Sequence, residues 1–117
     1  MNEPSLPQTD RREHERKPLR IEAHLLPPQQ PPFRVRLIDI SHGGLRMACS
    51  VNPPLMSVSV IRMALPRPDR GAAPLIEVGV QVINSIYSRT EDGFRVGLKF
   101  LEMPAAAKGI ISAFLKT

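Results

Sequence analysis

The chain has 117 residues, 42% of them hydrophobic, which is enough for one domain with its own core. Sixteen Lys and Arg residues against eleven Asp and Glu residues give a net charge of +5. This charge favours an anionic partner, but does not choose among nucleic acid, nucleotide, anionic membrane and acidic protein. The single cysteine, Cys49, excludes an internal disulfide and a cysteine zinc cluster.

The sequence predicts neither a membrane span nor a secretory leader. No apolar run approaches the ~20 residues that cross a bilayer. The first ten residues, MNEPSLPQTD, lack the apolar core of a signal peptide. Cys49 lies in an apolar stretch, where a small buried residue in a reducing compartment is expected. We therefore expect a cytoplasmic protein.

Six strands are predicted after a flexible tail at 1–9, because apolar and polar residues alternate with a period of two. Stretches rich in proline or glycine separate several of these strands, at 27–32 and 66–74. With no helical segment between them, the strands predict an all-β class, either an antiparallel barrel or a sandwich. The residues expected to face inward are Ile21, Ala23 and Leu25; Phe33, Val35 and Leu37; Leu45, Met47 and Cys49; Val58 and Val60; Ile76, Val78, Val80 and Val82; and Phe94, Val96, Leu98 and Phe100.

Residues 104–117 are predicted to form a helix, because the apolar period lengthens at this point. Pro104 suits a first helical turn. The helix would cover an open edge or mouth of the strands, or dock on a partner. The residues that recur at helical spacing are Ala107, Ile110, Ile111, Phe114 and Leu115.

The segment RREHER, residues 11–16, gathers three arginines before the first strand. In an extended chain Arg12 and Arg16 point the same way, about 13 Å apart along the backbone. A guanidinium donates two parallel hydrogen bonds to phosphate oxygens or to the O6 and N7 of guanine, and it stacks on a purine. Arg11, Arg12 and Arg16 are therefore candidate binding residues. The alternative is a solvated charged linker.

The segment DISHGG, residues 39–44, interrupts a strand-like run with poor strand formers. Asp39 and Ser41 share one face of a strand, and a carboxylate there can accept hydrogen bonds from guanine N1–H and N2–H₂. Gly43 and Gly44 allow positive φ and a close approach of the backbone to a ligand. The alternative is an Asx-turn that only reverses the chain, with His42 exposed to solvent.

Together the two segments resemble the motifs of the PilZ domain family. RREHER matches the RxxxR pattern through Arg12 and Arg16, with Arg11 as the common extra arginine, and DISHGG matches D/N-x-S-x-x-G through Asp39, Ser41 and Gly44. The late stretch VGLKFL resembles the closing strand of that family. The resemblance covers residues 10–103, and it rests on both motifs occurring in this order and spacing inside a chain of predicted strands.

The resemblance implies a six-stranded antiparallel β-barrel at 10–103, including the arginine loop, followed by the helix at 104–117. It also implies binding of cyclic di-GMP, a bacterial second messenger. The implied contacts are guanine edges and phosphates for the arginines, the base edge for Asp39 and Ser41, and the turn for Gly44. The ligand-binding set is Arg11, Arg12, Arg16, Asp39, Ser41, Gly43 and Gly44.

We thus expect a receptor or adaptor whose arginine loop orders on binding cyclic di-GMP and alters docking to an unidentified downstream protein. One alternative is a nucleic-acid-binding barrel, although the chain has no Trp and one Tyr to serve as stacking platforms. The other is an interaction module that needs no ligand. An enzyme, a metal site and a cofactor are not expected. The three histidines lack metal-ligand spacing, and no glycine-rich phosphate loop with a lysine occurs.

Overall fold

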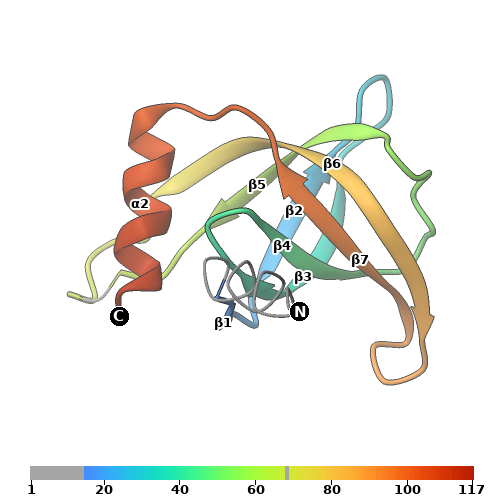
Figure 1. Cartoon of the computed structure of the whole chain (residues 1–117), viewed down its shortest axis with the longest axis horizontal. Helices are drawn as coiled ribbons and strands as arrows, with labels where there is room; N and C mark the ends of the chain where they lie inside the picture. The colour runs from blue at the N-terminus through green and yellow to red at the C-terminus, as the bar shows by residue number, and fades with distance from the viewer. Residues whose placement is uncertain (1–14, 68) are drawn as a thin grey trace, which may run out of the picture.

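The computed structural model describes residues 15–67 and 69–117, so the predicted tail at 1–9, Arg11 and Arg12 lie outside the described residues. Strands and one helix follow each other in the order that the sequence predicts (Figure 1). The elements are β1 Lys17–Pro18, β2 Glu22–Leu26, β3 Phe33–Ile40, β4 Gly44–Cys49, β5 Val58–Ala64, β6 Leu75–Ser88, β7 Gly93–Phe100 and α2 Ala105–Leu115.

The strands form a closed antiparallel barrel. Each neighbour in the order β3-β2-β5-β6-β7-β4 is paired, and a further β3–β4 pairing closes the ring. The predicted six-stranded barrel with a C-terminal helix is thereby confirmed. The structure adds one strand, β1, which pairs with the end of β3 opposite Asp39 and Ile40. Pro18 has no N–H to donate, which helps to keep β1 short.

The barrel interior is filled by aliphatic side chains, as the alternation predicts for β2, β3, β4, β6 and β7. The prediction for β5 is wrong. Val58 is 47% exposed, whereas Ile61 and Met63 are buried and lie opposite Val78 and Ile76 of β6. Apolar residues occupy both faces of this segment, and the face with the larger side chains faces the core because it removes more apolar area from water.

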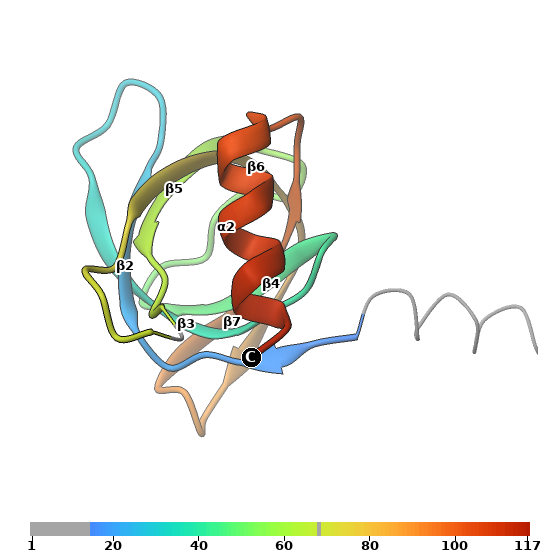
Figure 2. The ribbon, with the colours of Figure 1, turned by 90° about the vertical axis from the view of Figure 1, so that its left-hand side faces the viewer.

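Helix α2 lies across one open end of the barrel (Figure 2). Its buried residues Ala107, Ile111 and Phe114 join the core, which confirms the predicted inner face of the helix. At its C-terminal end, the Lys17 ammonium donates to the carbonyl oxygens of Phe114 at 2.9 Å and of Thr117 at 3.0 Å. A cation at this end complements the helix dipole.

Among residues 15–67 and 69–117, no helix is long and apolar enough to cross a membrane.

Gly44 begins β4 where that strand packs closely against β7. A Cβ at this position would lie 2.0 Å from the backbone oxygen of Leu98, so no other residue fits without a backbone shift. Gly43 and Gly44 could adopt positive φ, but no glycine among the described residues does so. Gly44 is needed for close strand approach rather than for an unusual dihedral angle.

We predict that Gly44→Ala lowers the free energy of unfolding by about 2–3 kcal/mol, because the backbone must shift to relieve the overlap. Gly109→Ala is the matched control. Nothing lies within 4 Å of a Cβ at Gly109, so the gain in helix propensity should raise the free energy of unfolding by up to about 1 kcal/mol. Urea unfolding measures both, and a Gly44→Ala variant as stable as the wild type would contradict the packing argument.

Candidate functional site

Asp39 lies near the end of β3, in a row of residues that crosses four strands. Pro18 of β1 and Arg46 of β4 are its partners in register, and Gly97 of β7 is the partner of Arg46. The register of β3 and β4 shifts between Leu37 and Asp39. Irregularities of this kind change the direction of side chains near a strand end, and they are common beside binding sites.

The Asp39 carboxylate is held between two guanidinium groups. Arg16 Nε donates to Oδ1 at 2.8 Å. Arg46 Nε lies 3.1 Å from Oδ1 and 2.9 Å from Oδ2, and Arg46 Nη2 donates to Oδ2 at 2.5 Å. Asp39 as a whole is 7% exposed. The two arginines therefore supply the counter-charge that a buried carboxylate requires.

These contacts set the protonation state of Asp39. Burial raises the pKa of its carboxyl group, but the hydrogen bonds and charges of Arg46 and Arg16 outweigh burial, and the net pKa lies below the ordinary value of 3.8. The hydrogen bond to Asp39 in turn raises the pKa of Arg46. Asp39 is thus an anion at neutral pH and acts as an acceptor only.

Ser41 forms the turn that follows Asp39. Its buried Oγ accepts the backbone N–H groups of Gly43 at 3.2 Å and Gly44 at 3.3 Å, and it lies 3.4 Å from Arg16 Nη1. The backbone N–H of Ser41 also donates to the carbonyl oxygen of Gly44 at 2.8 Å, so the backbone and the serine hydroxyl together close the turn. The aspartate, which an Asx-turn would use, contacts the arginines instead.

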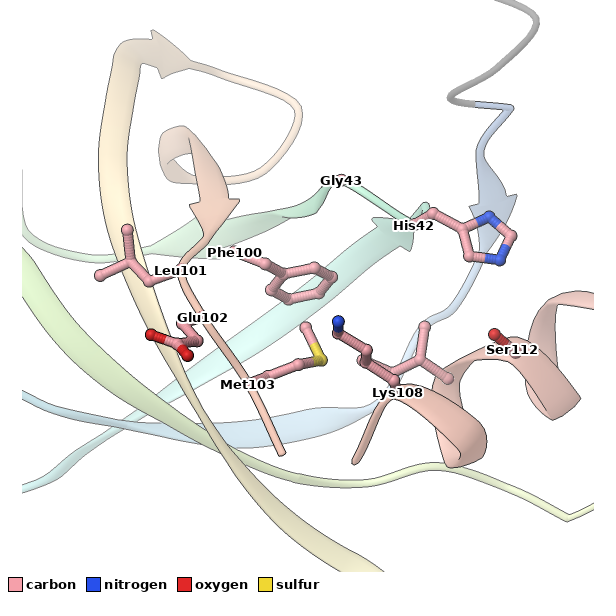
Figure 3. Close-up of a pocket in the computed structure, with 9 residues that line it drawn as sticks. His42, Gly43, Phe100, Leu101, Glu102, Met103, Lys108 and Ser112 are labelled. Atoms are coloured by element: carbon pink, nitrogen blue, oxygen red, sulfur yellow. The ribbon is translucent and has the colours of Figure 1, made fainter. Parts of the chain in front are cut away.

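A cavity of about 400 Å³ adjoins this turn, between the turn, the connection after β7 and the helix α2. Figure 3 shows the His42 ring directed away from Phe100 and Met103, whose side chains lie near Lys108. His42 is exposed, as predicted. The lining residues are His42, Gly43, Phe100, Leu101, Glu102, Met103, Lys108, Ile111 and Ser112.

A second buried carboxylate belongs to Glu91, in the turn between β6 and β7. Three arginines surround it. Arg20 donates to its two oxygens at 3.2 and 3.3 Å, while Arg36 lies 3.9 Å and Arg95 3.7 Å from the carboxylate. The Glu91 side chain is 3% exposed. The hydrogen bond from Arg20 lowers the pKa of Glu91 against the opposing effect of burial, and the charges of Arg36 and Arg95 lower it further.

The two carboxylate clusters occupy one outer face of the sheet. Arg36 is opposite Ala48 of β4, and Ala48 is opposite Arg95 of β7. Ala48 is two residues from Arg46, so both positions point to the same side of β4. The face therefore carries five arginines with two carboxylates buried among them, Arg16, Arg20, Arg36, Arg46 and Arg95 with Asp39 and Glu91.

Among the predicted site residues, the structure brings Arg16, Asp39 and Ser41 into contact, and Gly43 and Gly44 form the turn beside them. Arg11 and Arg12 are outside the described residues. Sequence reasoning missed Arg46. A signal was present, because Leu45 and Met47 were expected to face inward, which places Arg46 on the outer face. In the described chain no three His, Cys, Asp or Glu residues gather as a metal site would require.

A family model described as PilZ domain matches residues 10–117, which is nearly the whole chain. A comparison with the curated proteins found no match in sequence.

Solved structures with the same fold include three proteins at 14–16% identity. The Bacillus subtilis inhibitor of motility MotI/DgrA has a TM-score of 0.75 at 16% identity, covering 91% of this chain and 49% of that one. The K. pneumonia MrkH–c-di-GMP complex has a TM-score of 0.70 at 15% identity, covering 91% and 51%. The PilZ domain of CeSA from a cellulose-synthesizing bacterium has a TM-score of 0.64 at 14% identity, covering 87% and 96%. The chain thus spans about half the length of MotI and of MrkH.

We predict that Glu91→Gln lowers the free energy of unfolding by about 1–2 kcal/mol at neutral pH, because the buried arginine-bound charge is lost. The folded-state pKa of Glu91 lies below its ordinary value of 4.5. The contribution of the Glu91 charge to the free energy of unfolding is therefore fully present above pH 4.5. It is lost as the pH falls through the lower pKa of the folded state. The difference between wild type and variant should shrink over that acidic range.

Urea unfolding at a series of pH values measures this difference. Glu77→Gln is the control, since Glu77 is 49% exposed and pairs only at the surface with Arg62, so its loss should cost less than about 1 kcal/mol. Equal effects of the two substitutions would contradict the assignment of Glu91 as a buried anchor.

Proposed function

The chain belongs to the PilZ domain family, and on that premise we propose that it is a receptor for cyclic di-GMP. The ligand would bind on the outer face of the barrel, where the arginine segment meets the turn after β3. The proposed contact residues are Arg11, Arg12, Arg16, Asp39, Ser41, Gly43 and Gly44. One of the solved structures with this fold is a complex with that ligand, MrkH.

One observation carries the proposal: Arg16 contacts both Asp39 and Ser41. These residues come from two motifs that are 23 residues apart at their nearest members. A turn that only reversed the chain would not need an arginine from a distant segment beside it. The contact supports the view that the two motifs act as one site.

The chemistry of the site suits a guanine nucleotide. The ionised Asp39 carboxylate can accept two hydrogen bonds from the N1–H and N2–H₂ edge of guanine. The guanidinium of Arg16 can donate to phosphate oxygens or to the guanine O6 and N7. The Ser41 hydroxyl, which accepts the N–H groups of Gly43 and Gly44, fixes the turn beside this position.

On this proposal, ligand binding exchanges contacts at Arg16. Its guanidinium turns from Asp39 to the ligand, and the arginine segment closes over the ligand because the phosphates neutralise its positive charge. The surface presented before β1 changes as a result, and a downstream protein that docks there would distinguish the two states. The ordering of the segment and the identity of that protein stay predictions.

The basic outer face keeps the nucleic-acid alternative open to test. Several arginines of this face form ion pairs with Asp39 and Glu91. Among the exposed large hydrophobic residues of the described chain, only Tyr87 is aromatic. Both facts favour a small anionic ligand over a long single strand, which needs stacking platforms. The expectations of a non-enzymatic, cytoplasmic protein stay predictions.

We predict that the full chain binds cyclic di-GMP and that Arg16→Ala and Asp39→Ala each weaken binding at least about tenfold, because each removes a charged hydrogen-bonding group. Isothermal titration calorimetry measures affinity and stoichiometry. Arg62→Ala is the control, because Arg62 pairs with Glu77 on β5 and β6, away from the site. Its affinity should equal that of the wild type.

Absence of binding by the wild type would overturn the receptor proposal, and unchanged affinity in both site variants would overturn the site. A gel shift with random oligonucleotides tests the alternative directly. Tight retention that falls steeply with added salt would favour nucleic acid as the partner. Protection of the backbone amides at 11–16 on adding cyclic di-GMP would support ordering of the segment.

A further inference from the structure

We infer that Arg46, which belongs to neither motif, is a positioning residue of this site: it holds Asp39 in place while Arg16 turns to the ligand. The inference rests on the proposed function, since it concerns the binding of cyclic di-GMP by Asp39.

The two arginines that contact Asp39 differ in how their backbones are held. Arg46 is in the middle of β4, paired with Asp39 on one side and with Gly97 on the other. Arg16 immediately precedes β1, which is two residues long and pairs only with β3. Displacing the backbone of Arg46 would break strand pairing on both sides of β4, whereas displacing that of Arg16 would disturb only the two-residue pairing of β1 with β3 and the Lys17 contacts to α2.

The hydrogen bonds to Asp39 also show that Arg46 is held more firmly than Arg16. Arg46 reaches both carboxylate oxygens of Asp39, through Nε and Nη2, whereas Arg16 reaches only Oδ1. Departure of Arg16 therefore leaves an acceptor position on Oδ1 for a ligand N–H group. Asp39 is not left as a buried charge without a partner, because Arg46 remains on both oxygens.

Within the described residues, the register positions that flank Asp39 and Arg46 carry no charged side chain. In the row that crosses the sheet, β1 presents Pro18 beside Asp39 and β7 presents Gly97 beside Arg46. Among the described residues, the charges that lower the pKa of Asp39 are those of Arg16 and Arg46. Once Arg16 has turned to the ligand, Arg46 is the described residue that still opposes the effect of burial on this carboxyl group.

The experiment compares Arg46→Met, Arg46→Lys and the control Arg62→Met in the full chain. Arg62 is a matched control, because it also pairs with a carboxylate across two strands and its side chain is 39% exposed, against 40% for Arg46. Two quantities are measured for each protein. Carboxyl-carbon NMR gives the pKa of Asp39 without ligand, and calorimetry gives the affinity for cyclic di-GMP between about pH 4 and pH 7.

In the wild type and in Arg62→Met, the pKa of Asp39 should lie below 3.8, so affinity should not depend on this group above about pH 5. In Arg46→Met the pKa should rise, because burial persists while the stronger partner is lost. Affinity should fall about tenfold or more at neutral pH, and further as the pH falls. Arg46→Lys should restore part of the pKa shift and part of the affinity, since it restores the charge without the two-oxygen geometry.

An unchanged pKa of Asp39 in Arg46→Met, or a pH profile of binding identical to that of the wild type, would overturn the inference even if the wild type binds tightly. Absence of binding by the wild type would instead overturn the proposed function, while the NMR titration would still report whether Arg46 keeps Asp39 ionised. If Arg46→Met does not fold, the test rests on Arg46→Lys. Binding by Arg46→Lys equal to that of the wild type at every pH would then overturn the role of Arg46 as a positioning residue.

Discussion

The site depends on one buried carboxylate shared by two guanidinium groups. Burial disfavours the charged form of Asp39 at the end of β3, and Arg16 and Arg46 supply the compensation. Because Arg16 precedes β1 and Arg46 is in β4, the Asp39 carboxylate links the residue before the edge strand to a strand of the barrel. The short strand β1 pairs with β3 at Asp39. A ligand that competes for Asp39 would therefore act on a contact that holds Arg16 to the barrel.

The barrel supplies a rigid support for that exchange. Its ring of strands closes through the β3–β4 pairing, and the turn between these two strands is held by the Ser41 hydroxyl and by the close approach of Gly44 to Leu98. The same outer face carries Glu91, which lies among three further arginines. In each cluster, a buried carboxylate offsets part of the repulsion among the five guanidinium groups on this face.

Much of the fold was predictable because the alternation is local. On β7, the sequence FRVGLKF places every second residue inward, and burial in the structure follows it. On β5 the same reasoning failed, since Val58, Val60, Ile61 and Met63 put apolar residues on both faces and only the partner strand β6 decides which face is buried. The close packing of Gly44 against β7 could not be predicted either, because it is a contact between residues far apart in the chain.

By itself, the sequence determined the all-β class, the C-terminal helix and the candidate pair of polar segments, because periodicity and residue chemistry act over a few neighbouring positions. Only the tertiary structure decided which charges meet. That Arg46 shares Asp39 with Arg16, and that Glu91 in an ordinary turn is buried among arginines from three other places in the chain, depends on strand register and barrel closure. Arg16 and Asp39 are 23 residues apart and Arg20 and Glu91 are 71 residues apart, and no local pattern encodes the geometry that brings them together.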